Sequence, residues 1–198
     1  MDLQVKKQSK IKVAGLDPSM SNWGIALGEL DLKEAYLDIT SVHLVHPNKL
    51  KKSKERQNAK DVFLAQDLYE QNMQLLKDVD IIFAELPIGS QSARAMASYG
   101  ICLGVVGALN ISLNKQIIQV TPMDVKKVVG NNNPSKLDMI NWAMDEHPET
   151  DFPTYKQGGI HYISATKAEH MADAIAAIHA GCKQQSFLNV INQLRETL

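Results

Sequence analysis

The sequence predicts an α/β fold with a mixed five-stranded sheet flanked by helices. Two apolar runs flank a short polar turn near the N-terminus, and a third run alternates between apolar and polar residues. Later in the chain, strand-like apolar runs alternate with segments of helical periodicity. The expected order is three strands, helix, strand, helix, strand and then helices, and this order places the helices on the faces of one sheet.

The N-terminal third is predicted to form an antiparallel meander of three strands. Residues 11–17 and 23–28 are apolar and flank the turn PSMSN, and residues 36–46 alternate in polarity. Over residues 55–77 the leucines recur with a helical period. The segment VDIIFAEL at 79–86 is then typical of a buried strand, because it is rich in β-branched and aromatic residues.

The second half continues with helices and one more strand. A helix is expected over 90–110, in which Gly100, Gly104 and Ala108 recur every four residues and leave a smooth face. The other expected elements are a strand within 115–122, a helix from Asp124, a turn at 130–135, a helix from Lys136 to about Asp145, a loop over 146–164 and a long helix from Ala165.

Length and composition indicate one folded domain. The chain has 198 residues, of which 44% are hydrophobic, which suffices for one well-buried core and is too little for two of comparable size. We therefore expect a single domain over 1–198 with a core of about 11–182. Charged residues make up 22% and are mixed in sign, which argues against global disorder.

Charge and cysteine usage narrow the class of protein further. The net charge of −1 argues against a nonspecific coat for nucleic acid, although residues 49–60 concentrate six basic side chains. This segment is either a basic flap or a solvated loop. Cys102 and Cys182 form no C-x-x-C motif, which is typical of a reduced compartment, and we expect a cytoplasmic protein.

One uncharged segment is long enough to span a bilayer. Residues 95–114 carry no charge, but Ser, Asn, Tyr and three glycines dilute their apolar character. We interpret this segment as a buried helix of a protein that does not associate with a membrane.

Four polar side chains stand where chemistry at a sheet edge would need them. Asp17 ends the first predicted strand and Glu85 ends the fourth, so the two carboxylates project from one edge if those strands are neighbours. His170 and Asp173 share one face of the last helix. Oxygen-rich clusters suit Mg²⁺, and two ions bridged by an Asp activate water on a phosphodiester. Taken singly, each residue also fits a turn, a loop cap or a solvated helix face.

Four fragments occur in an order typical of one family. They are GLDPSMSNWGIAL at 15–27, IIFAELP at 81–87, TPMDVKKVVGNNNPSK at 121–136 and HMADAIAAIHAG at 170–181. With these fragments, most of residues 11–182 resembles the RuvC-like Holliday-junction resolvases of the ribonuclease-H-like superfamily, especially phage-type members. The resemblance implies a ribonuclease-H-like fold and a location in the cytoplasm of a bacterial cell or a phage-infected host. It also implies a structure-selective endodeoxyribonuclease that resolves Holliday junctions or other branched DNA by paired, metal-dependent nicks.

The resemblance also implies a set of metal ligands. Asp17 resembles the family's metal-bridging carboxylate, Glu85 its second ligand and Asp173 its helix ligand. His170 resembles a position that helps to bind metal or to handle the attacking water, and Glu169 is an alternative for that role. The implied cofactor is two Mg²⁺ ions per active site. Mn²⁺ is also expected to support activity, because imidazole is a softer ligand than carboxylate.

A second group of residues resembles the DNA contacts of the family. Lys126, Lys127 and Lys136 match a segment that carries phosphate-contacting lysines, although such lysines also occur as plain solvent-facing residues. Ile88 stands where some members carry an aromatic residue that stacks on a base. An apolar wedge by Ile88 or stacking by Tyr99 is therefore expected in its place.

The partner expected besides branched DNA is a second copy of the chain. The family dimerises through the helix after the Glu strand, which here carries Gly100, Gly104 and Ala108. Two matched nicks across a two-fold symmetric junction also require two active sites. Alternatively, these small residues pack on the chain's own sheet.

Three other functions remain open at this point. The segment GLDPSMSNWG at 15–24 also resembles a phosphate-binding hairpin of sugar-kinase or actin-like ATPases, but those folds duplicate the domain and this chain is too short for that. The others are a catalytically silent protein that binds branched DNA on the same fold, and a nuclease that acts on structured RNA.

Overall fold

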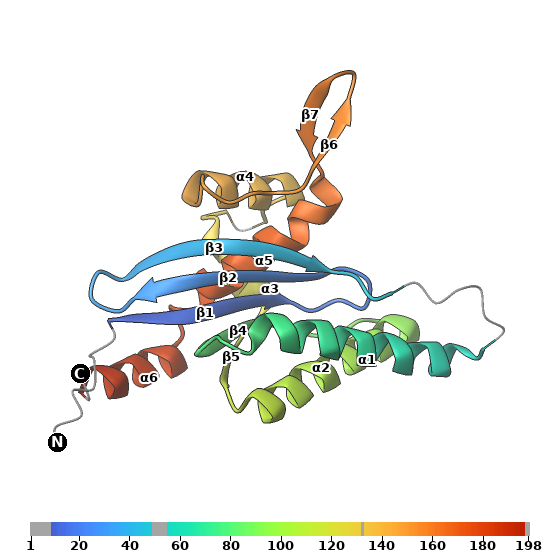
Figure 1. The fold of residues 1–198 in the computed structure, drawn as a ribbon, viewed down its shortest axis with the longest axis horizontal. Helices are drawn as coiled ribbons and strands as arrows, with labels where there is room; N and C mark the ends of the chain where they lie inside the picture. The colour runs from blue at the N-terminus through green and yellow to red at the C-terminus, as the bar shows by residue number, and fades with distance from the viewer. Residues whose placement is uncertain (1–8, 49–54, 132, 197–198) are drawn as a thin grey trace.

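The computed structural model, which describes residues 9–48, 55–131 and 133–196, has a five-stranded mixed sheet at its centre (Figure 1). The strand order is β3–β2–β1–β4–β5. The first three strands form the predicted antiparallel meander, and β4 pairs parallel to both β1 and β5. The strands are β1 (Lys10–Asp17), β2 (Trp23–Asp31), β3 (Tyr36–Val45), β4 (Ile81–Glu85) and β5 (Gln116–Val120). The sequence-based fold prediction is therefore confirmed.

Helices cover both faces of this sheet and form two separate cores. The helices α1 (Gln57–Leu76) and α2 (Ala93–Leu113) pack on one face. The other face is covered by α5 (Ala165–Gly181), with α3 (Pro122–Val128), α4 (Lys136–Glu146) and α6 (Gln185–Glu196) around it. The chain thus has three layers, with the sheet in the middle.

The alternation of side chains along the strands decides which face each residue serves. In β1, Val13 belongs to the core under α5, whereas Leu16 belongs to the core under α1 and α2. In β4, Phe83 belongs to the core under α5 and Ile82 to the core under α1 and α2. Because successive side chains of a strand point to opposite faces, Asp17 shares the face of Val13 and Glu85 shares the face of Phe83. Both carboxylates therefore lie on the side of α5.

Two glycines let α5 lie directly on the sheet. A Cβ atom at Gly15 would overlap the backbone carbonyl oxygen of Ala174, and one at Gly24 would overlap that of His170. The backbone of α5 thus touches β1 and β2 without intervening side chains. This close approach fixes the height of the helix above the strand ends.

Two boundaries differ from the sequence-based expectation. Helix α3 begins at Pro122 and not at Asp124, because Thr121 and Asp124 form a reciprocal capping box. Helix α6 was not predicted at all. Phe187 and Ile191 of α6 are buried in the core under α5, so the packed part of the chain extends beyond the predicted limit at 182.

The expected loop over 146–164 contains a β-hairpin. Its strands are β6 (Thr154–Gln157) and β7 (Ile160–Ile163), which form a separate two-stranded sheet. Gly158 and Gly159 form the turn with φ of 59° and 86°. A two-residue Gly-Gly loop is the turn that a tight hairpin needs, because both positions require positive φ. The loop prediction was wrong for this segment.

The expectation that the uncharged helix is buried is also wrong for one of its sides. Helix α2 buries Cys102, Val105, Val106 and Leu109 against the protein. Its opposite side is open, and a Cβ atom at Gly100, Gly104 or Gly107 would meet nothing within 4 Å. By length and composition α2 passes the test for a membrane-spanning helix, which is weak evidence for a single helix because core helices pass it too.

Candidate active site

The two strand-end carboxylates occupy neighbouring strands at one edge of the sheet. The parallel pairing of β1 with β4 aligns Leu16 with Ala84, so Asp17 and Glu85 are the next residues on the two strands. Parallel neighbours end at the same edge, and both side chains lie on the α5 face. The structure therefore brings Asp17 and Glu85 together, as the sequence predicted.

Helix α5 brings two further predicted residues to this edge. The Nδ1 atom of His170 lies 2.6 Å from Oδ2 of Asp17 and donates a hydrogen bond to it. Asp173, one turn further along α5, interacts electrostatically with both Asp17 and Glu85. Gly24 allows this arrangement, because its missing side chain leaves room for the backbone of His170. All four residues predicted as the catalytic and metal-binding set thus lie at one end of the sheet.

The electrostatics of this cluster favour a cation. Burial raises the pKa of Glu85 to about 8, and the charges of Asp17 and Asp173 contribute to the rise. Burial likewise raises the pKa of Asp173 to about 7, with contributions from Asp17 and Glu169. The hydrogen bond to Asp17 raises the pKa of His170. The fold thus crowds these carboxyl groups so closely that Glu85 and Asp173 hold protons near neutral pH, and a cation would compete with those protons.

Two of the three predicted lysines lie beside the carboxylates. Lys126 of α3 and Lys136 of α4 line a cavity of about 170 Å³ together with Glu85, Glu169 and Asp173. The ammonium group of Lys136 lies 2.8 Å from the carboxylate of Glu169, so this lysine is held in an ion pair. Lys127 is exposed on α3 and does not line the cavity.

The loop between β4 and α2 carries the predicted wedge. Ile88 is 77% exposed in this loop, whereas Tyr99 is partly buried on α2.

Sequence reasoning missed the ion pair that anchors this region. Arg94 at the start of α2 donates to buried Asp61 of α1 at 2.5 and 2.7 Å, and this contact lowers the pKa of Asp61 to about 2. A basic residue at the first turn of a helix gave no signal of its partner 33 residues away.

The donor set has the chemistry that a hard divalent cation needs. Asp17, Glu85, Glu169 and Asp173 supply carboxylate oxygens, and Mg²⁺ prefers oxygen ligands. Among the described residues, no three His, Cys, Asp or Glu side chains already surround a common point. Two of these carboxylates are instead paired with cationic partners, Asp17 with His170 and Glu169 with Lys136. Metal binding therefore requires these pairs to open or rearrange.

The predicted basic segment at 49–60 is described only in part. Residues 49–54 lie outside the described part of the chain, and only its end from residue 55 is described.

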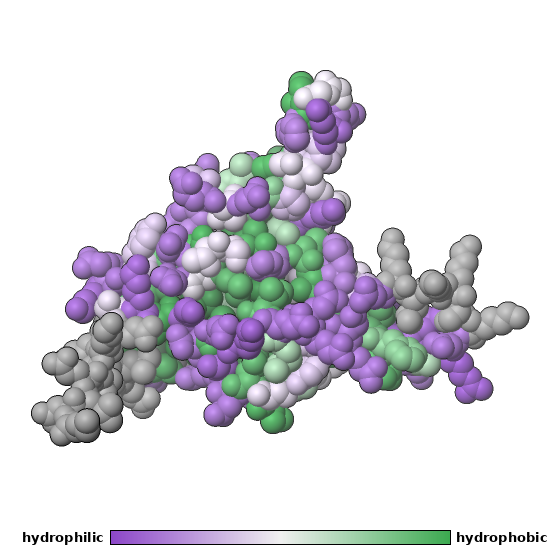
Figure 2. Space-filling model, in the orientation of Figure 1, coloured by the Kyte–Doolittle hydropathy of each residue, from purple (hydrophilic) through white to green (hydrophobic). Residues whose placement is uncertain are grey.

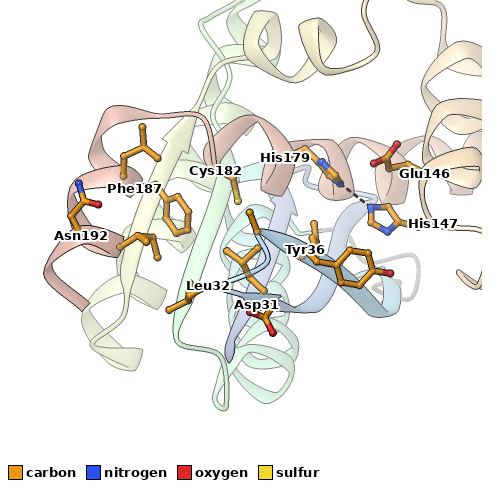
Figure 3. Close-up of a pocket in the computed structure, with 14 residues that line it drawn as sticks. Asp31, Leu32, Tyr36, Glu146, His147, His179, Cys182, Phe187 and Asn192 are labelled. Atoms are coloured by element: carbon orange, nitrogen blue, oxygen red, sulfur yellow. Dashed lines mark hydrogen bonds between the residues drawn. The ribbon is translucent and has the colours of Figure 1, made fainter. Parts of the chain in front are cut away.

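A second cavity, of about 370 Å³, lies at the opposite end of α5 (Figure 3). His179 and Cys182 at the end of α5 face the turn between β2 and β3 and the side chains of α6. The Nε2 atoms of His147 and His179 lie 2.8 Å apart, so one ring donates a hydrogen bond and the other accepts it. None of the predicted site residues lines this second cavity.

No protein-family model and no curated protein sequence matches the chain. Solved structures do match. The chain is 16% identical to Thermus thermophilus RuvC in complex with a Holliday junction substrate, over 90% of this chain and 96% of that one, with a TM-score of 0.58. For the fowlpox virus Holliday junction resolvase the identity is 12%, the coverage 87% and 98%, and the TM-score 0.52. The complex of the fowlpox resolvase with Holliday junction DNA is 12% identical to this chain, over 93% of this chain and 99% of that one, with a TM-score of 0.51. The chain therefore has the ribonuclease-H-like fold of the RuvC-type resolvases.

Proposed function

We propose that the chain is a structure-selective endodeoxyribonuclease that resolves Holliday junctions or other branched DNA by paired, metal-dependent nicks. One observation carries this proposal: Asp17, Glu85 and Asp173 converge at one edge of the sheet, where burial and mutual repulsion raise the pKa of Glu85 and Asp173. The similar structures named as Holliday junction resolvases share this fold, which supports DNA over other phosphodiester substrates.

The proposed cofactor is a pair of Mg²⁺ ions, with Mn²⁺ as a substitute. Asp17, Glu85 and Asp173 would hold the ions, with His170 or Glu169 as the remaining ligand. Such ions activate a water and stabilise the leaving oxygen of a phosphodiester. The residues of the chain orient this chemistry, since His170 fixes the carboxylate of Asp17 by its hydrogen bond and α5 is held in place by direct contact with Gly15 and Gly24.

The lysines of the site would hold the DNA backbone. Lys126 lies close enough to the carboxylates to lower the pKa of Glu85, so a phosphate bound at the carboxylates also feels its charge. Lys136 would exchange Glu169 for a phosphate group, and this exchange would free Glu169 for a metal ion. Lys127 and the exposed Ile88 extend the proposed DNA contact outward. Phosphate contacts position a substrate without reading its sequence.

The open side of α2 supports a symmetric homodimer. A stripe at helical spacing along this helix is exposed, and it consists of Met96, Gly100, Leu103, Gly104, Gly107 and Ile111. The glycines do not pack on the chain's own sheet, because a Cβ atom at these positions would meet no neighbour. Exposed apolar side chains beside glycines permit close packing against a second copy.

The dimer is tested by Gly104→Leu, with Asn141→Leu on the exposed side of α4 as the control for an added leucine. Gly104→Leu is expected to weaken self-association and to convert paired nicks in a cruciform plasmid into single nicks, while Asn141→Leu leaves both unchanged. Sedimentation and the ratio of linear to open-circular product are the measurements. The dimer is contradicted if wild type sediments as a monomer, both with and without junction DNA, and still yields linear plasmid.

The nuclease activity is tested with a labelled four-way junction, a fork, a linear duplex and a structured RNA, each in Mg²⁺ and in Mn²⁺. Wild-type protein should nick the branched DNA in preference to the others. Asp17→Asn should lower junction cleavage by orders of magnitude and preserve junction binding, because it removes a metal ligand and a repulsive charge. Asp145→Asn, an exposed aspartate of α4, is the matched control and should cleave like wild type.

Two outcomes would contradict the proposal. Binding of junction DNA by wild type without cleavage in either ion would identify a silent binding protein, and preferential cleavage of RNA would identify an RNA nuclease. Full single-turnover cleavage by Asp17→Asn would remove the assignment of this residue.

A further inference from the structure

We infer that the β6–β7 hairpin is a second contact element for branched DNA, in which two stacked tyrosines hold bases exposed at the branch point. This inference rests on the proposed function, because it names a further contact for the same substrate. The hairpin belongs to none of the segments in which the resemblance placed DNA contacts.

The hairpin presents aromatic side chains to solvent. It projects from the body of the molecule (Figure 1), and both hydrophobic and hydrophilic residues are exposed on it (Figure 2). Tyr155 and Tyr162 are paired across the two strands, with ring centroids 5.7 Å apart and an angle of 28° between the rings. They remain 49% and 43% exposed, and Ile160 beside them is 59% exposed. The tyrosines thus stack on each other and offer their remaining surface to a ligand.

The hairpin is fixed at its root and free at its tip. Phe152 before β6 is buried in the core, and the backbone amide of Ser164 after β7 donates to the carbonyl oxygen of Pro153 at 2.8 Å. An isolated two-stranded hairpin is only marginally stable in water. The exposed tyrosines and Ile160 lie outside the core, so core packing does not account for their position, whereas a binding role does.

The charge of this segment selects a polyanion as its partner. Residues 152–168 contain Lys156 and Lys167 and no Asp or Glu, although the whole chain has a net charge of −1. Lys156 and His161 lie directly opposite each other in the hairpin. Aromatic side chains that stack on bases, next to lysines that contact phosphates, are the combination that single-stranded nucleic acid requires. Unpaired or unstacked bases occur at the branch point of branched DNA and not within a linear duplex.

The root of the hairpin also lies close to the carboxylates. Ser164 and Asp173 are joined by the first turns of α5, and the helical rise of 1.5 Å per residue separates them by about 14 Å along the axis. One turn of a DNA duplex rises by about 34 Å. DNA with a phosphate at Asp173 therefore passes within reach of the hairpin.

The test measures binding of a fluorescent four-way junction and of a linear duplex in the presence of EDTA, which separates binding from cleavage. The double variant Tyr155→Ala/Tyr162→Ala is expected to weaken junction binding by about tenfold or more. Its binding of the linear duplex should weaken by less than about threefold. Tyr36→Ala is the control, since Tyr36 is a more exposed tyrosine (65%) at the far end of the sheet, and it should bind like wild type. Lys156→Gln should lower the salt slope of binding by about one ion.

The outcomes separate this inference from the proposed function. If wild type binds and cuts the junction but the double tyrosine variant binds it within twofold of wild type, the hairpin inference alone is wrong. Equal losses in the double variant and in Tyr36→Ala also overturn it. If wild type binds no branched DNA, the proposed function and this inference both fail. Thermal unfolding of the double variant should match wild type, because the tyrosines contact each other and not the core.

Discussion

The two ends of α5 use buried ionisable groups in opposite ways. Along its first half and up to its midpoint, His170 and Asp173 face Asp17 and Glu85 at the carboxylate end, and burial raises the pKa of Glu85 and Asp173. Near its end, His179 faces His147 (Figure 3), and burial lowers the pKa of His179 to about 4. Burial disfavours the charged form at both ends, so an acid becomes weaker and a base becomes weaker too.

The difference lies in how each end is satisfied. The neutral imidazoles of His147 and His179 complete each other, because one donates and the other accepts, and Trp142 packs edge-on against His179 at 5.2 Å. Glu85 and Asp173 can become neutral only by holding a proton near pH 7, because their pKa values are raised to about 8 and about 7. The two histidines therefore satisfy each other within the protein, whereas the proposed metal ions would take the place of the protons at the carboxylate end. Of the two ends, the carboxylate end is the better candidate for function.

The largest effect is expected from lifting α5 off the carboxylate end. Gly24→Ala places a methyl group on the carbonyl oxygen of His170, and we expect a loss of about 3 kcal/mol in the free energy of unfolding, together with loss of junction cleavage. Asn141→Ala is the control, because Asn141 is exposed on α4 and alanine favours a helix. Chemical denaturation of both variants is the measurement. Equal stability of Gly24→Ala and wild type would show that α5 does not rest on β2.

A smaller loss is expected when the charge partner of Asp17 is removed. His170→Ala should lower junction cleavage by about 100-fold, since residues that orient metal ligands typically contribute 10-fold to 100-fold. His170→Asp should keep activity and shift the preference from Mn²⁺ toward Mg²⁺. Rates measured across titrations of both ions decide the matter. An alanine variant as fast as wild type in both ions would assign the ligand role to Glu169.

The smallest effect is a difference in how the free energy of unfolding depends on pH at the carboxylate end and at the histidine end. It is measured in EDTA, so that no metal is bound. The pKa of Glu85 in the folded protein is about 8, above its unfolded value of about 4.5, so stability from this end is lost as pH rises through that range. The pKa of His179 is lowered from 6.5 to about 4, so stability from the histidine end is lost as pH falls through that range. Each group contributes a slope of at most about 1.4 kcal/mol per pH unit.

Variants should therefore change the pH dependence of unfolding in opposite directions. Glu85→Gln should raise stability relative to wild type at pH 8 more than at pH 5. His179→Gln should lose less stability than wild type between pH 7 and pH 5. Urea unfolding at three pH values measures both. Parallel curves for the three proteins would mean that the two ends do not titrate on folding.

The sequence predicts the carboxylate end well because its signals are local. Asp17 and Glu85 are recognisable as the last residues of apolar runs, and the spacing of His170 and Asp173 places them on one helix face. The contacts between distant segments are different. The close contact of Gly24 with the backbone of His170 and the ion pair of Asp61 with Arg94 depend on how separate elements pack. Neither contact produces a periodic pattern in the sequence.

The histidine end and the hairpin were missed for related reasons. His147 follows a helix and His179 lies inside one, and nothing in either stretch indicates that they meet. The composition of residues 146–164, rich in Gly, Pro and polar groups, is typical of a loop, although Gly158 and Gly159 stand between two short runs with Tyr and Ile. The two-residue glycine turn was the available signal for the hairpin.

Titration calorimetry with Mg²⁺ and Mn²⁺ tests the central claim most directly, namely that the carboxylate end is a metal site. Wild type should bind both ions and release protons at pH 7, because the pKa values of Glu85 and Asp173 are about 8 and about 7 and a ligating carboxylate must be ionised. Repetition in buffers of different ionisation enthalpy counts the protons released. Asp17→Asn should bind at least tenfold more weakly, and Asp145→Asn should match wild type. Equal affinity of Asp17→Asn and wild type, or binding without proton release, would contradict the account.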